Sequence, residues 1–217
     1  MDFTTARVNM VESQVRANGV QDGALLAAMA AVPRELFVPK PLRSLAYADK
    51  DLDLGAGRWL TEPLVLARLL QAAAVQPTDI VLVVGDSCGY ATALAARLAS
   101  YVLSLDTESE SAQRAAPVLT ELGLTNVDFV LGPLAAGHPA KAPYDAVVLA
   151  GAVAEVPAEL GRQLAEGGRL AAVVRGTAGA GKGILAVRVG DTVSRRPLFD
   201  AATPLLPGMA PHPGFVF

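Results

Sequence analysis

Helical periodicity dominates the first part of the chain. Between residues 2 and 45, apolar side chains recur at three- and four-residue steps, which predicts a helical arm. A glycine-bearing loop is expected over Leu54–Arg58. After it, Thr61 is placed to cap a helix, and Pro63 is tolerated in the first turn of that helix.

From residue 80 onward, short apolar runs alternate with helical segments. Ile80–Val84 is continuously apolar, as expected of a strand buried on both faces. The predicted strands are 80–84, 102–105, 127–131, 146–150, 170–174, 184–189 and 193–199, and the predicted helices are 89–99, 110–122 and 157–164. Pro117 is expected to kink or split the second helix, and Gly167-Gly168 to end the third.

This alternation predicts an α/β fold with a mostly parallel seven-stranded sheet and helices on both faces. The last two strands lack a helix between them, so they are expected to form an antiparallel hairpin at the edge. We expect a single domain over residues 1–217, with an N-terminal arm and substrate-side loop (1–60) and an α/β core (61–217). The proline-rich tail PLLPGMAPHPGFVF is expected to dock on the surface.

Composition narrows the class of protein. Hydrophobic residues make up 52% of the 217, and the net charge is −3 with both signs mixed, which argues against a nucleic-acid or anionic-lipid partner. Cys88 is the only cysteine, so no disulfide can form within the chain, as in a reducing compartment. The N-terminus lacks the apolar run of a signal peptide, and the longest apolar stretch, 146–154, falls short of the roughly 20 residues of a membrane helix. We expect a cytoplasmic protein with no membrane contact; the oligomeric state stays open.

A candidate nucleotide loop, VLVVGDSCGY, follows the first predicted buried strand. In open α/β sheets this is where ligands bind, because glycines there let the backbone approach the ligand. Gly85 and Gly89 are present, but Ser87 interrupts both G-x-G-x-x-G and G-x-G-x-G. The alternative interpretation is an ordinary strand-to-helix turn.

Asp106 ends the next predicted strand, about 20 residues beyond the loop. A carboxylate there can accept hydrogen bonds from both ribose hydroxyls, although a solvated aspartate at a strand end is common. Together the loop and Asp106 favour a nucleoside cofactor without separating NAD from S-adenosylmethionine. The terminal hairpin favours the methyltransferase arrangement by analogy of fold.

The remaining motifs do not indicate a function. The segment Gly176–Gly183 resembles a P-loop, but Gly183 replaces the required hydroxyl and an alternating strand pattern follows, so we interpret it as a loop between strands. The two histidines, His138 and His212, are far apart and predict neither a metal site nor a catalytic triad. Cys88 lies at a predicted helix N-terminus, which can lower a thiol pKa, but a small packing residue is the favoured interpretation.

Over nearly its whole length the sequence resembles the protein-L-isoaspartate O-methyltransferase family. The similar segments are MVESQVRANGV (10–20), VPRELFVP (32–39), LAYADKDLDLGAG (45–57), LTEP (60–63) in place of Ile-Ser-Gln-Pro, the loop VLVVGDSCGY, APYDAVVLAGA and EGGRL (166–170). The N-terminal segments are the specific ones, because other methyltransferases share only the later motifs.

The resemblance implies methyl transfer from S-adenosylmethionine to the α-carboxylate of isoaspartyl residues in damaged proteins, which are the implied partners. Thr61 stands at the position of the family's important serine. The residues then expected at the cofactor site are Gly85, Asp86, Ser87, Cys88, Gly89, Asp106, Thr107, Gly132 and Pro133, with no metal.

Three departures from the family pattern concern the cofactor. Val83 replaces an acid of the first strand, Ser87 replaces the middle glycine of the loop, and Pro133 replaces the aspartate that contacts the adenine. Each lost buried contact weakens binding roughly ten- to a hundredfold, and a positive φ at Ser87 would add strain. Weak binding of S-adenosylmethionine is therefore expected. The alternatives are a non-catalytic family member that acts as a binding or structural protein, and a methyltransferase for another carboxylate.

Overall fold

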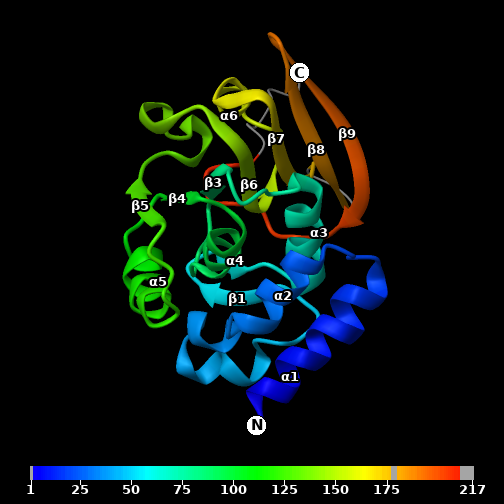
Figure 1. The fold of residues 1–217 in the computed structure, drawn as a ribbon, viewed down its shortest axis with the longest axis vertical. Helices are drawn as coiled ribbons and strands as arrows, with labels where there is room; N and C mark the ends of the chain where they lie inside the picture. Colours follow the sequence, from blue (N-terminus) through cyan, green and yellow to red (C-terminus); the bar gives the residue numbers. More distant parts are fainter. Residues whose placement is uncertain (1, 177–179, 211–217) are drawn as a thin grey trace, which may run out of the picture.

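A seven-stranded sheet forms the centre of the protein (Figure 1). The computed structural model describes residues 2–176 and 180–210. The strand order is β5-β4-β3-β6-β7-β8-β9. Their bounds are β3 Ile80–Val84, β4 Tyr101–Asp106, β5 Val127–Leu131, β6 Tyr144–Val153, β7 Leu164–Val174, β8 Gly181–Val189 and β9 Thr192–Ala201.

The strand directions confirm the predicted sheet. Neighbours from β5 through β7 pair in parallel, whereas β7 with β8 and β8 with β9 pair antiparallel. One predicted boundary is wrong, because β7 begins at Leu164 and runs through Gly167-Gly168. The β6–β7 register is irregular between the Tyr144–Leu164 and Ala146–Arg169 pairs, and Gly167 has φ +71°, so the two glycines form a bulge rather than a helix stop.

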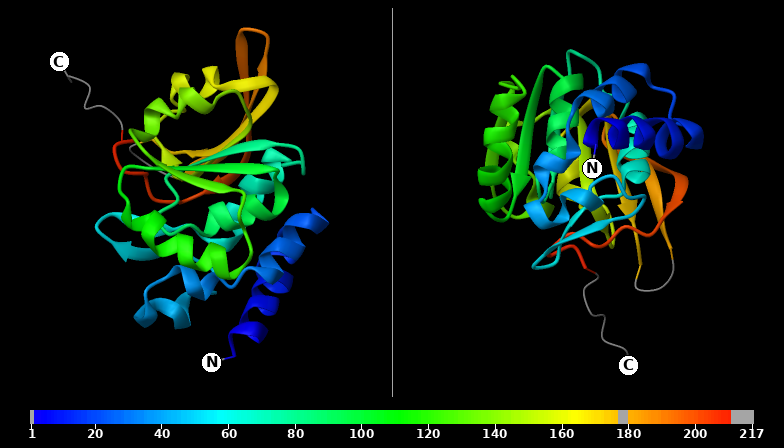
Figure 2. Two further views of the ribbon diagram at one scale, coloured as in Figure 1. Left: turned by 60° about the vertical axis from the view of Figure 1, so that its left-hand side comes forward. Right: turned by 90° about the horizontal axis from the view of Figure 1, so that it is seen from below.

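The main helices are α1 Phe3–Asn9, α2 Gly23–Ala31, α3 Pro63–Ala73, α4 Tyr90–Leu98, α5 Glu110–Glu121 and α6 Ala158–Arg162. A π-helical segment η1 (Met10–Val15) and short 3₁₀ turns η2 (Arg16–Asn18), η3 (Arg34–Phe37), η4 (Lys40–Leu45), η5 (Leu134–Ala136) and η6 (Pro139–Lys141) complete the set. The predicted helical arm is confirmed, and it lies at the end of the molecule opposite the β8–β9 turn (Figures 1 and 2). α5 continues through Pro117 as a single helix, so the predicted split does not occur.

Each face of the sheet has its own apolar core. Alternate residues of a strand point to opposite faces, so Val81 and Val83 join one cluster and Leu82 and Val84 join the other. The first cluster includes side chains from α2 to α5 and from the N-terminal arm, and the second includes Leu160 of α6. Helices on both faces therefore bury the sheet, as the continuous apolar runs predicted.

A two-stranded hairpin replaces the loop expected over residues 54–58. β1 (Leu52–Gly55) pairs antiparallel with β2 (Arg58–Leu60), and the turn residues Ala56 and Gly57 have φ values of +52° and +72°. Two consecutive positive φ values match the twist of a tight hairpin turn. The predicted capping role of Thr61 is wrong, because Glu62 is the N-cap residue of α3 and Pro63 is its first residue.

The tail returns along the sheet after β9. The Ala152 N–H donates to the Pro204 carbonyl at 2.8 Å, and the Leu206 N–H donates to the Ala152 carbonyl at 2.7 Å. Leu206 and Met209 are buried in the second apolar cluster, so this part of the tail packs into the protein and not merely on its surface. The rest of the tail, with His212, lies outside the described residues.

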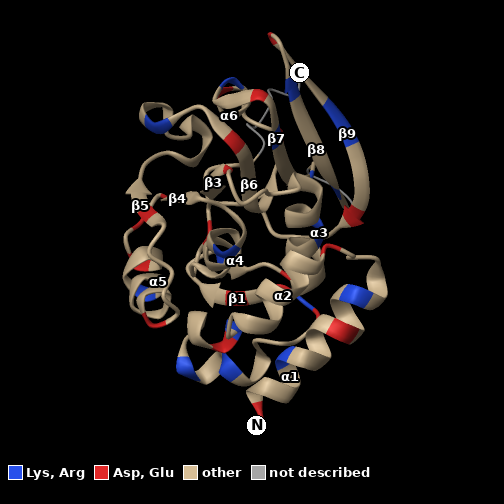
Figure 3. Cartoon of the chain, viewed as in Figure 1, with Lys and Arg blue, Asp and Glu red and all other residues tan. Residues whose placement is uncertain are grey.

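Lys and Arg residues and Asp and Glu residues are scattered over a mostly uncharged chain in the view of Figure 3. Within the described residues, no helix is long and apolar enough to cross a membrane. The P-loop-like segment runs from the end of β7 into β8, as predicted, although residues 177–179 lie outside the description.

Candidate cofactor and substrate site

The glycine loop joins the end of β3 to the start of α4. Gly85 and Gly89 have φ values of +73° and +89°, in the left-handed region that favours glycine. A Cβ at Gly89 would lie 2.2 Å from the Cβ of Ala115 on α5, so packing as well as backbone conformation requires glycine there. Because the loop follows β3, it lies at the carboxyl end of the parallel strands, as predicted from the sequence.

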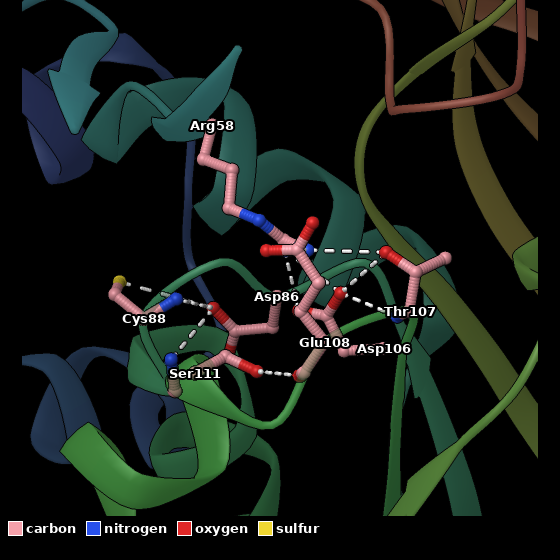
Figure 4. Close-up of polar contacts among 8 residues, drawn as sticks. Arg58, Asp86, Cys88, Asp106, Thr107, Glu108 and Ser111 are labelled. Carbon is pink, nitrogen blue, oxygen red and sulfur yellow. Dashed lines mark hydrogen bonds and ion pairs between the residues drawn. The ribbon is translucent and has the colours of Figure 1, made fainter. Parts of the chain in front are cut away.

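Asp86 holds the loop together from inside. Its carboxylate accepts hydrogen bonds from the Gly89 N–H at 3.0 Å and from the Thr92 N–H and hydroxyl at 2.7 and 2.8 Å. Burial raises the pKa of Asp86, and these hydrogen bonds oppose that rise. The side chain therefore stabilises the N-terminus of α4, and it points away from the Arg58–Asp106 group (Figure 4).

Ser87 and Cys88 occupy the middle of the loop. The non-glycine residues with positive φ in the described structure are Ala56 and Ala74, so the strain considered for Ser87 does not arise. Cys88 is fully buried, and burial raises the pKa of its thiol, as expected of a packing residue rather than a reactive one.

Asp106 ends β4 with its carboxylate directed at Arg58 of β2. Nη1 of Arg58 lies 2.8 Å from both carboxylate oxygens, and the Thr107 N–H donates to Oδ1 at 2.6 Å (Figure 4). Nη2 of Arg58 also contacts Thr107 Oγ1 at 3.1 Å and Glu108 at 3.2 Å. Burial lowers the pKa of Arg58, but the hydrogen bond and charge of Asp106, with the charge of Glu108, outweigh it and raise the pKa overall.

Thr61 lies where the β1–β2 hairpin meets the sheet. Its buried hydroxyl donates to the Ala150 carbonyl of β6 at 2.6 Å. The fully buried Arg34 fixes the same point, because its Nη2 donates to the Thr61 carbonyl at 2.6 Å and its Nε to the Ala46 carbonyl at 2.6 Å. The hydroxyl is therefore attached to the sheet edge that carries the glycine loop.

Gly132 and Pro133 follow the end of β5. The Gly132 N–H donates to the Asp106 carbonyl at 2.9 Å, which places this turn beside β4. The Pro133 side chain is exposed. The fold thus gathers every predicted site residue at one edge of the sheet, although Asp86 and Cys88 direct their side chains into the protein.

Thr61 and Ser87 share a small hollow with the tail. The hollow has a volume of about 10 Å³ and is lined by Gly57, Trp59, Thr61, Ser87, Ala150, Gly151 and residues 203–207. A Cβ at Gly85 or at Gly151 would lie 2.6 Å from Leu206, so the tail closes one side of this space.

Sequence reasoning missed three residues that shape the site: Arg34, Arg58 and Leu206. Arg34 stands in the family-like segment VPRELFVP, whereas Arg58 begins Arg-Trp-Leu, a segment too short to signal a strand by alternation. Nothing local marks Leu206, because its role depends on the tail returning to β6. Among residues 2–176 and 180–210 no group of three potential ligands is placed to hold a metal ion.

The sheet, the glycine loop and the acid at the end of β4 define a Rossmann-like methyltransferase domain. Within that class, the family model described as protein-L-isoaspartate(D-aspartate) O-methyltransferase matches residues 6–187. The chain belongs to this family.

Relatives of the chain carry the same family name. A protein-L-isoaspartate O-methyltransferase of Methanoculleus marisnigri is 42% identical over 168 residues, which is 77% of this chain and 76% of the relative. One from Roseiflexus sp. is 38% identical over 212 residues, covering 97% and 96%. A Plasmodium falciparum structure assigned to this enzyme, in complex with S-adenosyl-L-homocysteine, covers 92% of this chain and 97% of that one with a TM-score of 0.75 and 18% identity, and it supports the fold.

Proposed function

We propose that this chain transfers the methyl group of S-adenosylmethionine to the α-carboxylate of L-isoaspartyl residues in damaged proteins. The observation that carries the proposal, within the family just established, is the position of Thr61. A hydroxyl at the family's serine position lies on the edge of β6 and lines one hollow with Ser87 of the glycine loop. The hollow, of about 10 Å³, holds neither reactant, but it places the Thr61 hydroxyl beside the loop at which the methyl donor is proposed to bind.

The residues present fit this cofactor in part. Positive φ values at Gly85 and Gly89 permit close approach of a ligand, and Asp106 supplies the acceptor pair that a ribose diol needs. Val83 is fully buried in the core, Pro133 is exposed, and neither side chain has a hydrogen-bond acceptor, so the family's two acidic contacts are missing. We still predict weak binding of S-adenosylmethionine, but strain at Ser87 does not contribute to it.

The reaction needs little acid–base chemistry from the protein. When bound, S-adenosylmethionine supplies an electrophilic methyl group. A carboxylate with a pKa of about 4 is already ionised at neutral pH, so no general base is required. What the chain contributes is the position of the reactants, for which the buried Thr61 hydroxyl beside the glycine loop is suited, and the exclusion of water from them.

Thr61 has one hydroxyl proton, which it donates to Ala150. A substrate carboxylate is also an acceptor, so Thr61 can bind it only by rotating its proton away from the Ala150 carbonyl. We infer that this exchange orients the carboxylate for in-line attack on the methyl group.

We also infer a single domain, with residues 1–60 as the N-terminal arm and substrate-side hairpin and 61–217 as the core. One apolar cluster that contains residues of both parts supports the single domain. Isoaspartyl-containing proteins are the inferred partners, and a single, buried cysteine supports a cytoplasmic location.

Two measurements on the purified protein test the function. Calorimetric titration with S-adenosylhomocysteine reports cofactor binding, and transfer of a radiolabelled methyl group reports activity on an isoaspartyl peptide. The control peptide has the same sequence with normal aspartate. Label in the isoaspartyl peptide alone supports the proposal. Absence of transfer to it at millimolar cofactor would contradict the proposal and favour the non-catalytic alternative, and label in both peptides would point to another carboxylate substrate.

A further inference from the structure

One nitrogen of Arg58 contacts both carboxylate oxygens of Asp106. Nη1 of Arg58 lies 2.8 Å from Oδ1 and 2.8 Å from Oδ2, so it faces the edge between the two oxygens. The exposed fractions of the two side chains are 10% for Arg58 and 5% for Asp106. A ribose diol that donates from both hydroxyls needs this same edge.

The remaining acceptor capacity of Asp106 is partly used as well. Oδ1 also accepts from the Thr107 N–H at 2.6 Å, and this donor belongs to the backbone and cannot leave without moving the end of β4. Arg58 and a ribose diol therefore cannot both occupy the edge of the carboxylate. One of them has to leave.

Arg58 has an alternative partner nearby. Its Nη2 already lies 3.2 Å from Glu108, whose side chain is 58% exposed. A hollow of about 170 Å³ beside it is lined by Arg58, Glu108, Glu110 and Ser87, among others. The guanidinium can therefore turn away from Asp106 while it keeps an ion pair with an acidic side chain.

We propose that Arg58 competes with the ribose of the cofactor for Asp106 and so sets the affinity of the protein for S-adenosylmethionine. This inference rests on the proposed function. Binding of the nucleoside displaces the Arg58 guanidinium toward Glu108. Because Arg58 lies three residues before Thr61, the same displacement links the cofactor site to the hairpin that leads to the substrate-side hydroxyl.

The test compares two ligands by calorimetry: S-adenosylhomocysteine and its 2′,3′-dideoxy analogue. In the native protein, removal of the diol is expected to change the dissociation constant less than about threefold, because the pair with Arg58 re-forms when the diol is absent. In Arg58→Gln the carboxylate edge is free, so S-adenosylhomocysteine is expected to bind at least about fivefold tighter than in the native protein. In this variant, removal of the diol should raise the dissociation constant about tenfold or more. The analogue should bind both proteins equally.

Arg16→Gln is the matched control, because Arg16 forms an exposed pair with Glu12 at 2.9 Å in the N-terminal arm. It should bind both ligands as the native protein does. If Arg58→Gln does not fold, the native protein decides alone, through the ratio of its dissociation constants for the dideoxy analogue and for S-adenosylhomocysteine. A native ratio of tenfold or more, or weaker binding of S-adenosylhomocysteine by Arg58→Gln, would overturn the competition. If neither protein binds S-adenosylhomocysteine at millimolar concentration, the competition also falls, and the methyl-transfer assay then shows separately whether the proposed function stands.

Discussion

The Thr61 hydroxyl donates a hydrogen bond of 2.6 Å to the carbonyl oxygen of Ala150, which lies 89 residues later in the chain. This bond joins the segment that follows β2 to the central strand β6. Both atoms are buried, so neither has water as a substitute partner. The side chain that stands at the family's serine position is thus also a structural contact of the site.

Thr61→Val and Thr61→Ser should differ in both stability and kcat. Valine keeps the shape but leaves the Ala150 carbonyl without a donor, so we expect the free energy of unfolding to fall by about 1–3 kcal/mol. We expect kcat for an isoaspartyl peptide to fall at least about tenfold, because the carboxylate loses its orienting group. Serine keeps the hydroxyl and should retain kcat within about threefold. Equal kcat values for the two variants would exclude Thr61 from the reaction.

Asp106→Asn tests the buried ion pair by urea denaturation. The substitution keeps the size of the side chain and removes the main counter-charge of the largely buried Arg58 guanidinium, which keeps only its pair with Glu108, so we expect a loss of about 2 kcal/mol. Asp200→Asn is the control, because Asp200 pairs with Lys182 where both side chains are more than half exposed. That variant should lose less than about 1 kcal/mol. Similar losses in the two variants would show that the Arg58–Asp106 pair adds little to stability.

Gly89→Ala and Gly123→Ala separate backbone conformation from packing. Both glycines have positive φ, +89° and +70°, but a Cβ at Gly123 meets nothing within 4 Å, whereas at Gly89 it would lie 2.2 Å from the Cβ of Ala115. Gly123→Ala should cost about 1–2 kcal/mol for the left-handed conformation alone. Gly89→Ala should cost about 1–3 kcal/mol more, because α4 and α5 must move apart. Thermal and urea unfolding of the pair would reveal whether this difference exists.

Glu62→Gln tests an acidic cluster beside Thr61. Burial, together with the negative charges of Asp49 and Asp51, raises the pKa of Glu62 in the folded protein. The protonated form is therefore favoured in the folded state, and this stability is present below the unfolded pKa of about 4.3 and is lost as the pH rises through the folded pKa.

The glutamine variant should therefore match the native protein near pH 4. At pH 8 it should exceed the native protein by about 0.5 kcal/mol, a small value because the side chain is only half-buried. Urea denaturation at the two pH values measures this difference. A difference that does not change with pH would contradict the prediction.

The central strands of the sheet could be read from the sequence because they are buried on both faces. Ile80–Val84 has the predicted bounds, since the apolar run of a buried strand is a property of adjacent residues. The edge strand Val127–Leu131 also has the predicted bounds, although it is only partly buried. The hairpin of β1 and β2 was missed because β2 has three residues and is stabilised by its partner strand rather than by a run of its own. Gly167-Gly168 was misread because a diglycine fits a bulge as well as a helix end.

The candidate site, too, was predictable from the sequence only in part. The sequence by itself determined the glycine loop, the acid at the end of β4 and the hydroxyl at Thr61, because parallel strands bring their carboxyl ends to one edge. Only the tertiary structure decided where these side chains point. Asp86 turns inward to its own loop, Asp106 meets Arg58 from 48 positions earlier, and Leu206 returns with the tail to lie against Gly85. The pattern of residues specifies what each strand can bury, but the partner of a polar side chain depends on which distant segments the packed sheet places beside it.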